Sequence, residues 1–308
     1  MTKFLLTGGS GFIAAHILER LLQQGHTVVT TVRSEDKAQR IRDAYKSSSD
    51  RLEVVIVPDI AQENAFDEVA KIPGLEVVLH TASPFHWNFT DPQRELIDPA
   101  LIGTTGILRA IHRDAPSVRR VVVTSSFAAI LNKDKLGDGN TTFTEKSWNP
   151  STIADIHNDK PTAYRVSKTL AERAAWDFVE KNKPNFDLAT VNPPLVLGPV
   201  VHYLATLDAI NTSNDRVVAM LRGDWKKEIP FTGPVPYWVD VRDVADAHIF
   251  AAEKPEASGQ RLFTSAGRFS NRELVNAVKK NAPALATKLP ADDVKGGEPN
   301  DDATTFKI

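Results

Sequence analysis

Cysteine is absent from this chain of 308 residues. The absence excludes disulfides, thiolate catalysis and cysteine metal sites, and it is typical of a reducing compartment, so we expect a cytoplasmic protein. Apolar runs of the ~20 residues needed to span a bilayer are also missing, and the N-terminus lacks the apolar core of a signal peptide. The net charge is only -2, so no basic field indicates nucleic acid. We therefore expect neither a membrane nor a nucleic-acid partner.

What is present is a regular alternation of short apolar segments with longer amphipathic ones. The apolar segments resemble buried parallel strands, and we expect strands at Phe4–Thr7, Thr27–Val32, Leu52–Val57, Val77–Thr81, Val121–Thr124 and Leu188–Val191. Helices are expected between them, at Phe12–Gln24, Glu35–Ser47, Ala65–Lys71, Pro92–His112 and Pro161–Lys181. This rhythm predicts an α/β fold with a Rossmann-type doubly wound parallel sheet.

The rhythm breaks after Asn192-Pro193-Pro194 and returns with a strand and helix at Tyr237–Glu253. A further strand at Arg261–Thr264 and a helix near Asn271–Lys280 follow. We therefore predict a dinucleotide-binding domain at 1–192 plus 237–264. A smaller C-terminal substrate-binding lobe is expected at 193–236 plus 265–308.

A glycine cluster, Thr7-Gly8-Gly9-Ser10-Gly11-Phe12-Ile13, follows the first expected strand and opens the first helix. Glycines there allow a tight turn and a close backbone approach, and the amides at the helix N-terminus favour a pyrophosphate. A plain strand-to-helix turn is the alternative. The strand, the helix and the position in the chain together favour dinucleotide binding.

The end of the second strand indicates which dinucleotide. An NAD site usually places a carboxylate there for the ribose 2′-hydroxyl, whereas this chain has Arg33, with Lys37 one turn further on. Arg33 could bind a 2′-phosphate through two hydrogen bonds and Lys37 could add charge. Alternatively both are solvated cations at a helix start, where the helix dipole disfavours them. The pattern favours NADPH over NADH.

Tyr164 and Lys168 are four residues apart, so they lie on one face of a helix. A lysine beside a phenol favours the phenolate and eases proton exchange with a carbonyl or alcohol. Lowering the phenol pKa from ~10 to near 7 takes roughly 4 kcal/mol, whereas an exposed ion pair supplies only about 0–1 kcal/mol. The pair can therefore act in catalysis only inside a buried cleft.

With the glycine loop, this pair and the run Val123-Thr124-Ser125-Ser126, the chain resembles the extended short-chain dehydrogenase/reductase family. Within that family it is most similar to the fungal NADPH-dependent aldehyde/ketone (methylglyoxal-type) reductases, and more distantly to dihydroflavonol 4-reductases. The resemblance covers nearly the whole chain. It includes Val57-Pro58-Asp59-Ile60, the segments 79–85 and 145–150, Val191-Asn192-Pro193-Pro194 and the segment 239–245.

The resemblance implies NADPH-dependent reduction of aldehydes or ketones. Ser126 would hydrogen-bond the carbonyl, Tyr164 would donate the proton, and Lys168 would bind the nicotinamide ribose and stabilise the tyrosinate. Ser125 is a less favoured substitute for Ser126, which could instead cap a turn. The cofactor-binding set comprises Thr7, Gly8, Gly9, Ser10, Gly11, Phe12, Ile13, Arg33, Lys37, Asp59, Ile60, Thr81, Ala82, Ser83, Thr124, Tyr164, Lys168, Pro193, Val196 and Ser213.

Two of these assignments have a structural alternative. Asp59 could cap its loop, and the pair Pro193-Pro194 could simply end the preceding strand. Their place at strand ends favours binding. We expect the substrate to meet Phe85, Phe127 and Leu195. The wider set of pocket candidates adds His86, Trp87, Tyr203, Trp225, Tyr237 and Trp238. No cluster has metal-ligand spacing, so no metal is expected.

Relatives usually continue for about one helix beyond Phe306-Lys307-Ile308, and Ala291–Thr305 is polar. The chain is therefore either truncated or unusual at its C-terminus. The only partner that we expect is a small-molecule carbonyl substrate, and the protein would be a monomer or a homodimer.

Two other functions are compatible with the sequence: a nucleotide-sugar epimerase or dehydratase of the same fold, and a non-catalytic NADP-sensing regulator.

Overall fold

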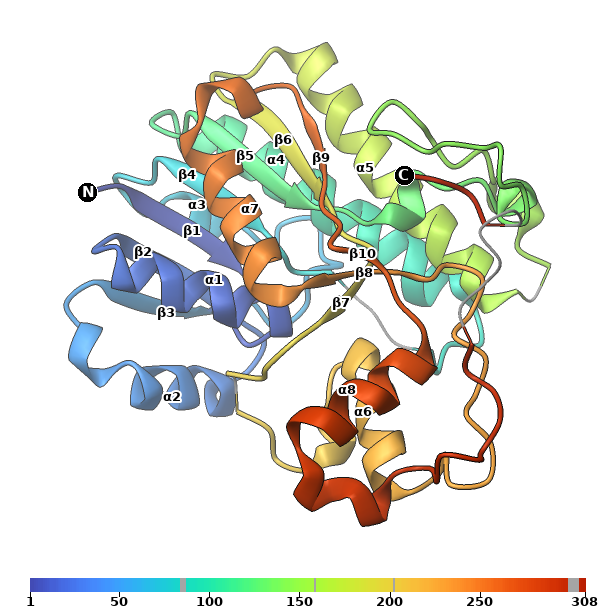
Figure 1. Cartoon of the computed structure of the whole chain (residues 1–308). Coiled ribbons are helices and arrows are strands. Elements are labelled where there is room, and N and C mark those ends of the chain that lie inside the picture. The colour runs from blue at the N-terminus through green and yellow to red at the C-terminus, as the bar shows by residue number, and fades with distance from the viewer. Residues whose placement is uncertain (84–86, 158, 202, 299–304) are drawn as a thin grey trace.

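A seven-stranded parallel sheet forms the centre of the protein, in the order β3-β2-β1-β4-β5-β6-β9 (Figure 1). The computed structural model describes residues 1–83, 87–157, 159–201, 203–298 and 305–308. The strands are β1 (Lys3–Thr7), β2 (Thr27–Val32), β3 (Leu52–Ile56), β4 (Val77–His80), β5 (Arg120–Thr124), β6 (Asp187–Asn192) and β9 (Arg261–Phe263). The order reverses between β1 and β4, which confirms the expected doubly wound fold.

Helices cover both faces of the sheet because its strands are apolar on both sides. One face packs against α1 (Phe12–Gln23), α2 (Glu35–Ala44) and α7 (Val241–Glu253). The other packs against α3 (Asp67–Ala70), α4 (Asp98–Asp114) and α5 (Lys160–Asn182). The helix expected at Pro92–His112 is divided, since a π-helical turn at Gln93–Ile97 precedes α4. Pro99 has no amide hydrogen to donate, so regular α-helical bonding cannot continue through it.

The second part of the molecule contains a small sheet and two helices. The strands β7 (Leu195–Leu197), β8 (Tyr237–Asp240) and β10 (Gly267–Arg268) pair in the order β10-β8-β7. The helices α6 (Thr212–Arg222) and α8 (Asn271–Asn281) pack together through a core of their own, below the main sheet in Figure 1. The expected division at residue 237 assigns β8 to the larger domain, although β8 pairs within the small sheet. The domain limits stay a prediction.

A cluster of aromatic rings joins these parts behind the end of β5. The Phe127 ring stacks on Phe263, with 4.7 Å between centroids, and also on Phe306. The hydroxyl of Tyr237 donates to the carbonyl oxygen of Phe306 at 2.7 Å. The last residues of the chain are thereby attached to the end of the sheet where a ligand is expected.

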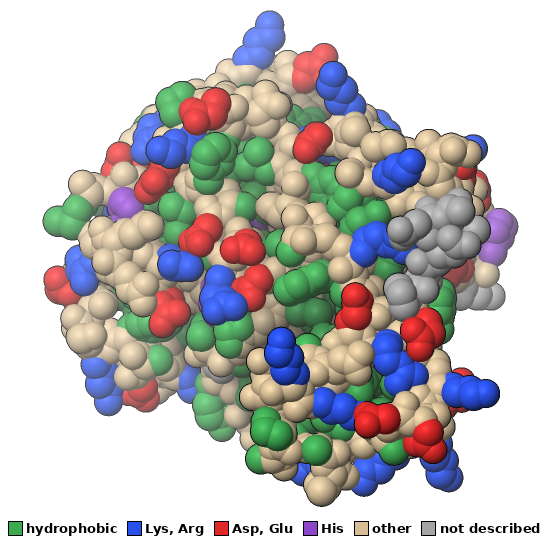
Figure 2. Space-filling model, in the orientation of Figure 1, with side chains coloured by type: hydrophobic (Ala, Val, Ile, Leu, Met, Phe, Trp, Pro, Cys, Tyr) green, Lys and Arg blue, Asp and Glu red, His purple; other side chains and the backbone are tan. Residues whose placement is uncertain are grey.

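The surface carries charges of both signs. On the face drawn in Figure 2, acidic and basic side chains are interspersed rather than gathered into a field of one sign. Among the helices that the structure describes, none combines the length and apolarity needed to cross a membrane.

Candidate active site

The glycine loop lies between β1 and α1, where its backbone passes close to two neighbouring strands. Gly8 has φ +76, a conformation that side chains rarely adopt, and a Cβ there would lie 3.1 Å from the Ala82 Cα. A Cβ on Gly9 would lie 2.1 Å from the Thr30 hydroxyl. No side chain caps α1, because its N-cap residue is Gly11. The loop therefore suits a phosphate at the helix N-terminus.

Thr7 connects this loop to the next ligand-facing segment. Its hydroxyl oxygen accepts from the amides of Thr81 and Ala82, each at 3.1 Å, and lies 3.0 Å from Nδ1 of His80. Burial lowers the pKa of His80 to about 3, so the imidazole is neutral. Because the Thr7 oxygen accepts two amides, its own hydrogen is available to Nδ1. These bonds hold the segment from Thr81 to Ser83 beside the glycine loop.

Arg33 and Lys37 follow β2 and lie close enough to repel one another. Burial, and then the charge of Arg33, lower the pKa of Lys37. Within the described residues, neither cation forms an ion pair with a carboxylate. A cavity beside Lys37 is lined by Gly9, Ser10 and Lys37, together with Asp36, Arg40 and Tyr203. The charge of Asp36 acts on Lys37 in the opposite direction to that of Arg33. Contact of these two cations with the 2′-phosphate of NADPH stays a prediction.

The residues after β3 occupy the third strand end. The Asp59 carboxylate accepts from the amide of Ala61 and from Nε2 of Gln62, both at 2.9 Å, and these bonds lower its pKa. This is the geometry of a loop cap. Ile60 lies against Gly103 of α4. Contact of either residue with adenine stays a prediction.

Tyr164, Lys168 and Ser126 meet at the carboxyl ends of the central strands. Tyr164 is partly buried in the structure, and burial raises the pKa of its phenol while a hydrogen bond with Ser126 acts in the opposite direction. The ammonium of Lys168 donates to the Ser83 hydroxyl at 3.1 Å and lies 3.5 Å from the carbonyl oxygen of Thr124. Burial lowers the pKa of Lys168 to about 8. The phenol and the serine hydroxyl can therefore reach one acceptor, with a cation nearby.

The remaining cofactor candidates surround this centre. The hydroxyl of Thr124 lies 2.7 Å from Nε2 of His248. The carbonyl oxygen of Pro193 accepts from the amide of Phe127 at 2.9 Å, which joins the ends of β5 and β6. Val196 is buried in β7, and Ser213 lies in the first turn of α6. Contact of each with a dinucleotide stays a prediction.

The substrate candidates are placed differently from one another. Phe85 and its neighbour His86 lie outside the described residues. Phe127 is 1% exposed within the aromatic cluster, so its ring supports the wall behind Ser126. Leu195 is half-buried at the start of β7. The Trp87 ring lies 6.1 Å from the ring of Tyr164 and is 36% exposed, so it is well placed to contact a substrate.

Three residues of the site were not predicted from the sequence: Glu172, Asn192 and Arg261. Glu172 is buried one turn beyond Lys168 on α5 and contacts both other residues. The sequence could have indicated Glu172, because positions 164, 168 and 172 are each four residues apart and so lie on one face of a helix. Arg261 lies 89 positions away in β9 and had no local signal. Among the described residues no group suitable for holding a metal ion occurs.

Comparisons with known proteins give the family of this chain. The model of the NAD dependent epimerase/dehydratase family matches residues 4–264. The ketoreductase azaE of Aspergillus niger is 46% identical, over 95% of this chain and 86% of that protein. The NADPH-dependent methylglyoxal reductase GRE2 of Saccharomyces cerevisiae is 39% identical, over 97% of this chain and 86% of that protein.

Solved structures give the same relationship. The crystal structure of yeast methylglyoxal/isovaleraldehyde reductase GRE2 complexed with NADPH has a TM-score of 0.87 and 36% identity, covering 99% of this chain and 90% of that chain. Vestitone reductase from alfalfa, at 23% identity and a TM-score of 0.71, shares the fold. The chain thus belongs to the NAD dependent epimerase/dehydratase family, the extended short-chain dehydrogenases/reductases.

Proposed function

We propose that this protein reduces aldehydes or ketones to alcohols with NADPH. The observation that carries the proposal is that Ser126, Tyr164 and Lys168 meet in a partly buried position beside the glycine loop. Relatives named as a ketoreductase and a methylglyoxal reductase support this reaction class. Arg33 and Lys37 fit the phosphate that distinguishes NADPH from NADH.

Bound NADPH would supply the hydride that reaches the carbonyl carbon. As negative charge develops on the carbonyl oxygen, Ser126 and Tyr164 donate hydrogen bonds to it. Tyr164 then gives its proton to that oxygen. Burial raises the pKa of this phenol, so the group enters the reaction protonated. Lys168 keeps a positive charge beside the phenolate that remains.

The substrate meets a wall that is mainly apolar. Trp87 lies beside Tyr164, and Leu195 is the first residue of β7 in the small sheet. We therefore propose a small carbonyl compound with an apolar or aromatic substituent as the substrate class. The assembly would be a monomer or a homodimer.

The test is a titration followed by a substrate panel. Tryptophan fluorescence should be quenched at lower concentrations of NADPH than of NADH. Loss of absorbance at 340 nm with a series of aldehydes and ketones should then identify the substrate, and chiral analysis should give the stereochemistry of the alcohol. NADPH binding without carbonyl turnover would instead support a regulator, and conversion of nucleotide sugars would support an epimerase or dehydratase.

A further inference from the structure

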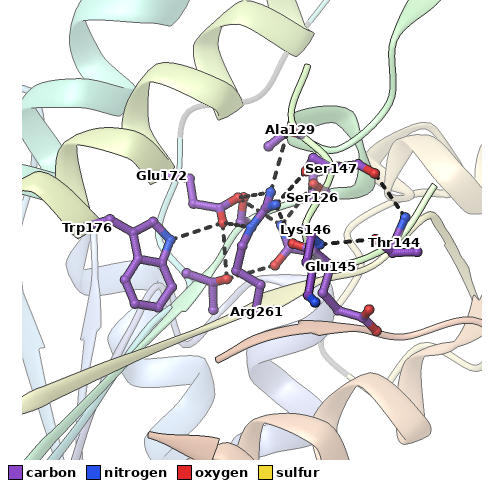
Figure 3. Close-up of polar contacts among 12 residues, drawn as sticks. Ser126, Ala129, Thr144, Glu145, Lys146, Ser147, Glu172, Trp176 and Arg261 are labelled. Carbon is purple, nitrogen blue, oxygen red and sulfur yellow. Dashed lines mark hydrogen bonds and ion pairs between the residues drawn. The ribbon is translucent and has the colours of Figure 1, made fainter. Parts of the chain in front are cut away.

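A buried carboxylate lies under the site, and the reaction proposed above does not use it. Glu172 is 1% exposed, and five side-chain donors surround its two oxygens, among them Trp176 and Arg261 (Figure 3). These contacts are to Ser125 Oγ at 2.5 Å, Asn192 Nδ2 at 2.8 Å, Trp176 Nε1 at 3.2 Å, Thr190 Oγ1 at 3.2 Å and Arg261 Nε at 2.6 Å. An ionised carboxylate is costly to bury unless it is paired and hydrogen-bonded. Here both conditions are met, because Arg261 pairs with the carboxylate and neutral donors hydrogen-bond to it.

Arg261 fixes this carboxylate to a separate loop. Its guanidinium also donates to the carbonyl oxygens of Glu145 and Ser147, at 2.7 and 2.6 Å. It stacks on Trp148, 3.7 Å from the ring centroid. Figure 3 shows the loop residues and Glu172 on opposite sides of the arginine. Arg261 of β9 therefore connects the carboxylate to the loop that precedes α5.

Two residues, Ser125 and Asn192, connect Glu172 to Ser126, the serine proposed to bind the carbonyl. Ser125, which donates to Glu172, immediately precedes Ser126. The side-chain nitrogen Nδ2 of Asn192 donates to Glu172 and also to the backbone carbonyl oxygen of Ser126, at 3.2 Å. A movement of the carboxylate would therefore shift the backbone that places the Ser126 hydroxyl.

Glu172 also faces Lys168 from the next turn of α5, and both line one small cavity with Ser83 and Thr124. The negative charge of Glu172 raises the pKa of Lys168, against the larger effect of burial. Within the described part of the chain, the one other titratable group that lines this cavity is His80 on β4, which is neutral because burial lowers its pKa to about 3. Of the groups beyond the cavity, Tyr164 lies on α5, His248 on α7 has a pKa of about 4 and contacts Thr124, and Arg261 on β9 pairs with Glu172.

We propose that Glu172 is a positioning residue for this carbonyl reduction. It holds the strand end that carries Ser126, and it keeps a negative charge facing Lys168. The inference rests on the proposed function, because it needs Ser126 and Lys168 to act on the carbonyl.

The test is E172Q, which keeps the shape of the side chain and removes its charge. We expect kcat to fall about 10- to 100-fold, as misplacement of a reacting group does, with the KM for NADPH changed less than kcat. The alkaline limb of the kcat–pH profile should also move to lower pH, by about one unit. The reason is that Lys168 loses its stabilising anion and gives up its proton more readily.

The matched control is Asp187→Asn, which breaks another ion pair, with a buried arginine and an exposed aspartate, at the opposite ends of β5 and β6. Arg120 there pairs with Asp187 and donates to the carbonyl oxygen of Ala251. This variant should lower the melting temperature without moving the alkaline limb. An E172Q enzyme that keeps the wild-type kcat and pH profile would overturn the inference, as would an equal shift in D187N.

A milder variant covers the case in which E172Q does not fold. Ser125→Ala removes one donor to the carboxylate but leaves its charge, so we expect a severalfold loss of kcat and an unmoved alkaline limb. An unchanged kcat, or a loss as complete as that of Ser126→Ala, would contradict the role of Glu172. Failure of the wild-type protein to reduce any carbonyl would instead contradict the proposed function, whatever these variants do.

Discussion

At the scale of single residues, burial decides what Tyr164 can do. A phenol with a raised pKa is protonated at neutral pH and can serve as the acid of a reduction. Tyr164→Phe should lower kcat by about 10²- to 10⁴-fold, the usual contribution of a general acid. NADPH should still quench the tryptophan fluorescence of the variant. Half the wild-type rate in Y164F would exclude the assignment.

The two cations after β2 determine cofactor preference. Arg33→Ala should raise the KM for NADPH about 10- to 100-fold, because a hydrogen bond to a charged group contributes roughly 1.5–3 kcal/mol. The KM for NADH should change little, since that cofactor carries no 2′-phosphate. Arg109→Ala, an exposed cation on α4 that contacts Thr105, is the control. An equal rise in the KM for NADPH and for NADH would show that Arg33 does not bind the 2′-phosphate.

At the scale of elements, the turn from β1 to α1 requires glycine at position 9. Gly9→Ala would force its methyl group to within 2.1 Å of the Thr30 hydroxyl, so the loop must move. We expect a loss of about 1–3 kcal/mol in the free energy of unfolding, together with weaker NADPH binding. Gly137→Ala has nothing within 4 Å and should be neutral in both assays. Urea denaturation and fluorescence titration measure the two effects, and normal binding by G9A would contradict the role of the loop.

Elements with strong periodicity could be predicted from the sequence, and short ones could not. The strand expected at Thr27–Val32 has those bounds in the structure, because it is a continuous β-branched run. The strand β7 has three residues and β10 has two, too few for any period, so the small sheet was missed. The helix α6 was missed as well.

The same limit applies to the site. Tyr164 and Lys168 share one helix, so their spacing alone brings them together. The partner of Glu172 in β9 depends on the strand order, in which β9 lies beside β6. That order places Arg261 opposite Thr190 in register, two residue pairs before the carboxyl ends of β6 and β9. Only the assembled sheet shows that an ion pair lies beneath Ser126.

At the scale of the whole molecule, buried histidines link stability to pH. Burial lowers the pKa of His80 to about 3 and of His248 to about 4, from 6.5 in each case. Above 6.5 both are neutral whether the chain is folded or unfolded, so their contribution is fully present there. As pH falls below 6.5, only the unfolded chain takes up these protons, and stability is lost until the folded pKa values are reached.

The free energy of unfolding should therefore decrease between pH 6.5 and pH 5 by roughly 2 kcal/mol for each histidine. Urea denaturation across this range measures the decrease. His248→Gln removes one of the two groups, so the slope should fall by about half even if the variant is less stable overall. His112→Gln, at an exposed position, should leave the slope unchanged. A slope that is the same in H248Q and wild type would mean that His248 is not held neutral by the fold, because a histidine that is protonated equally in both states cannot couple folding to pH.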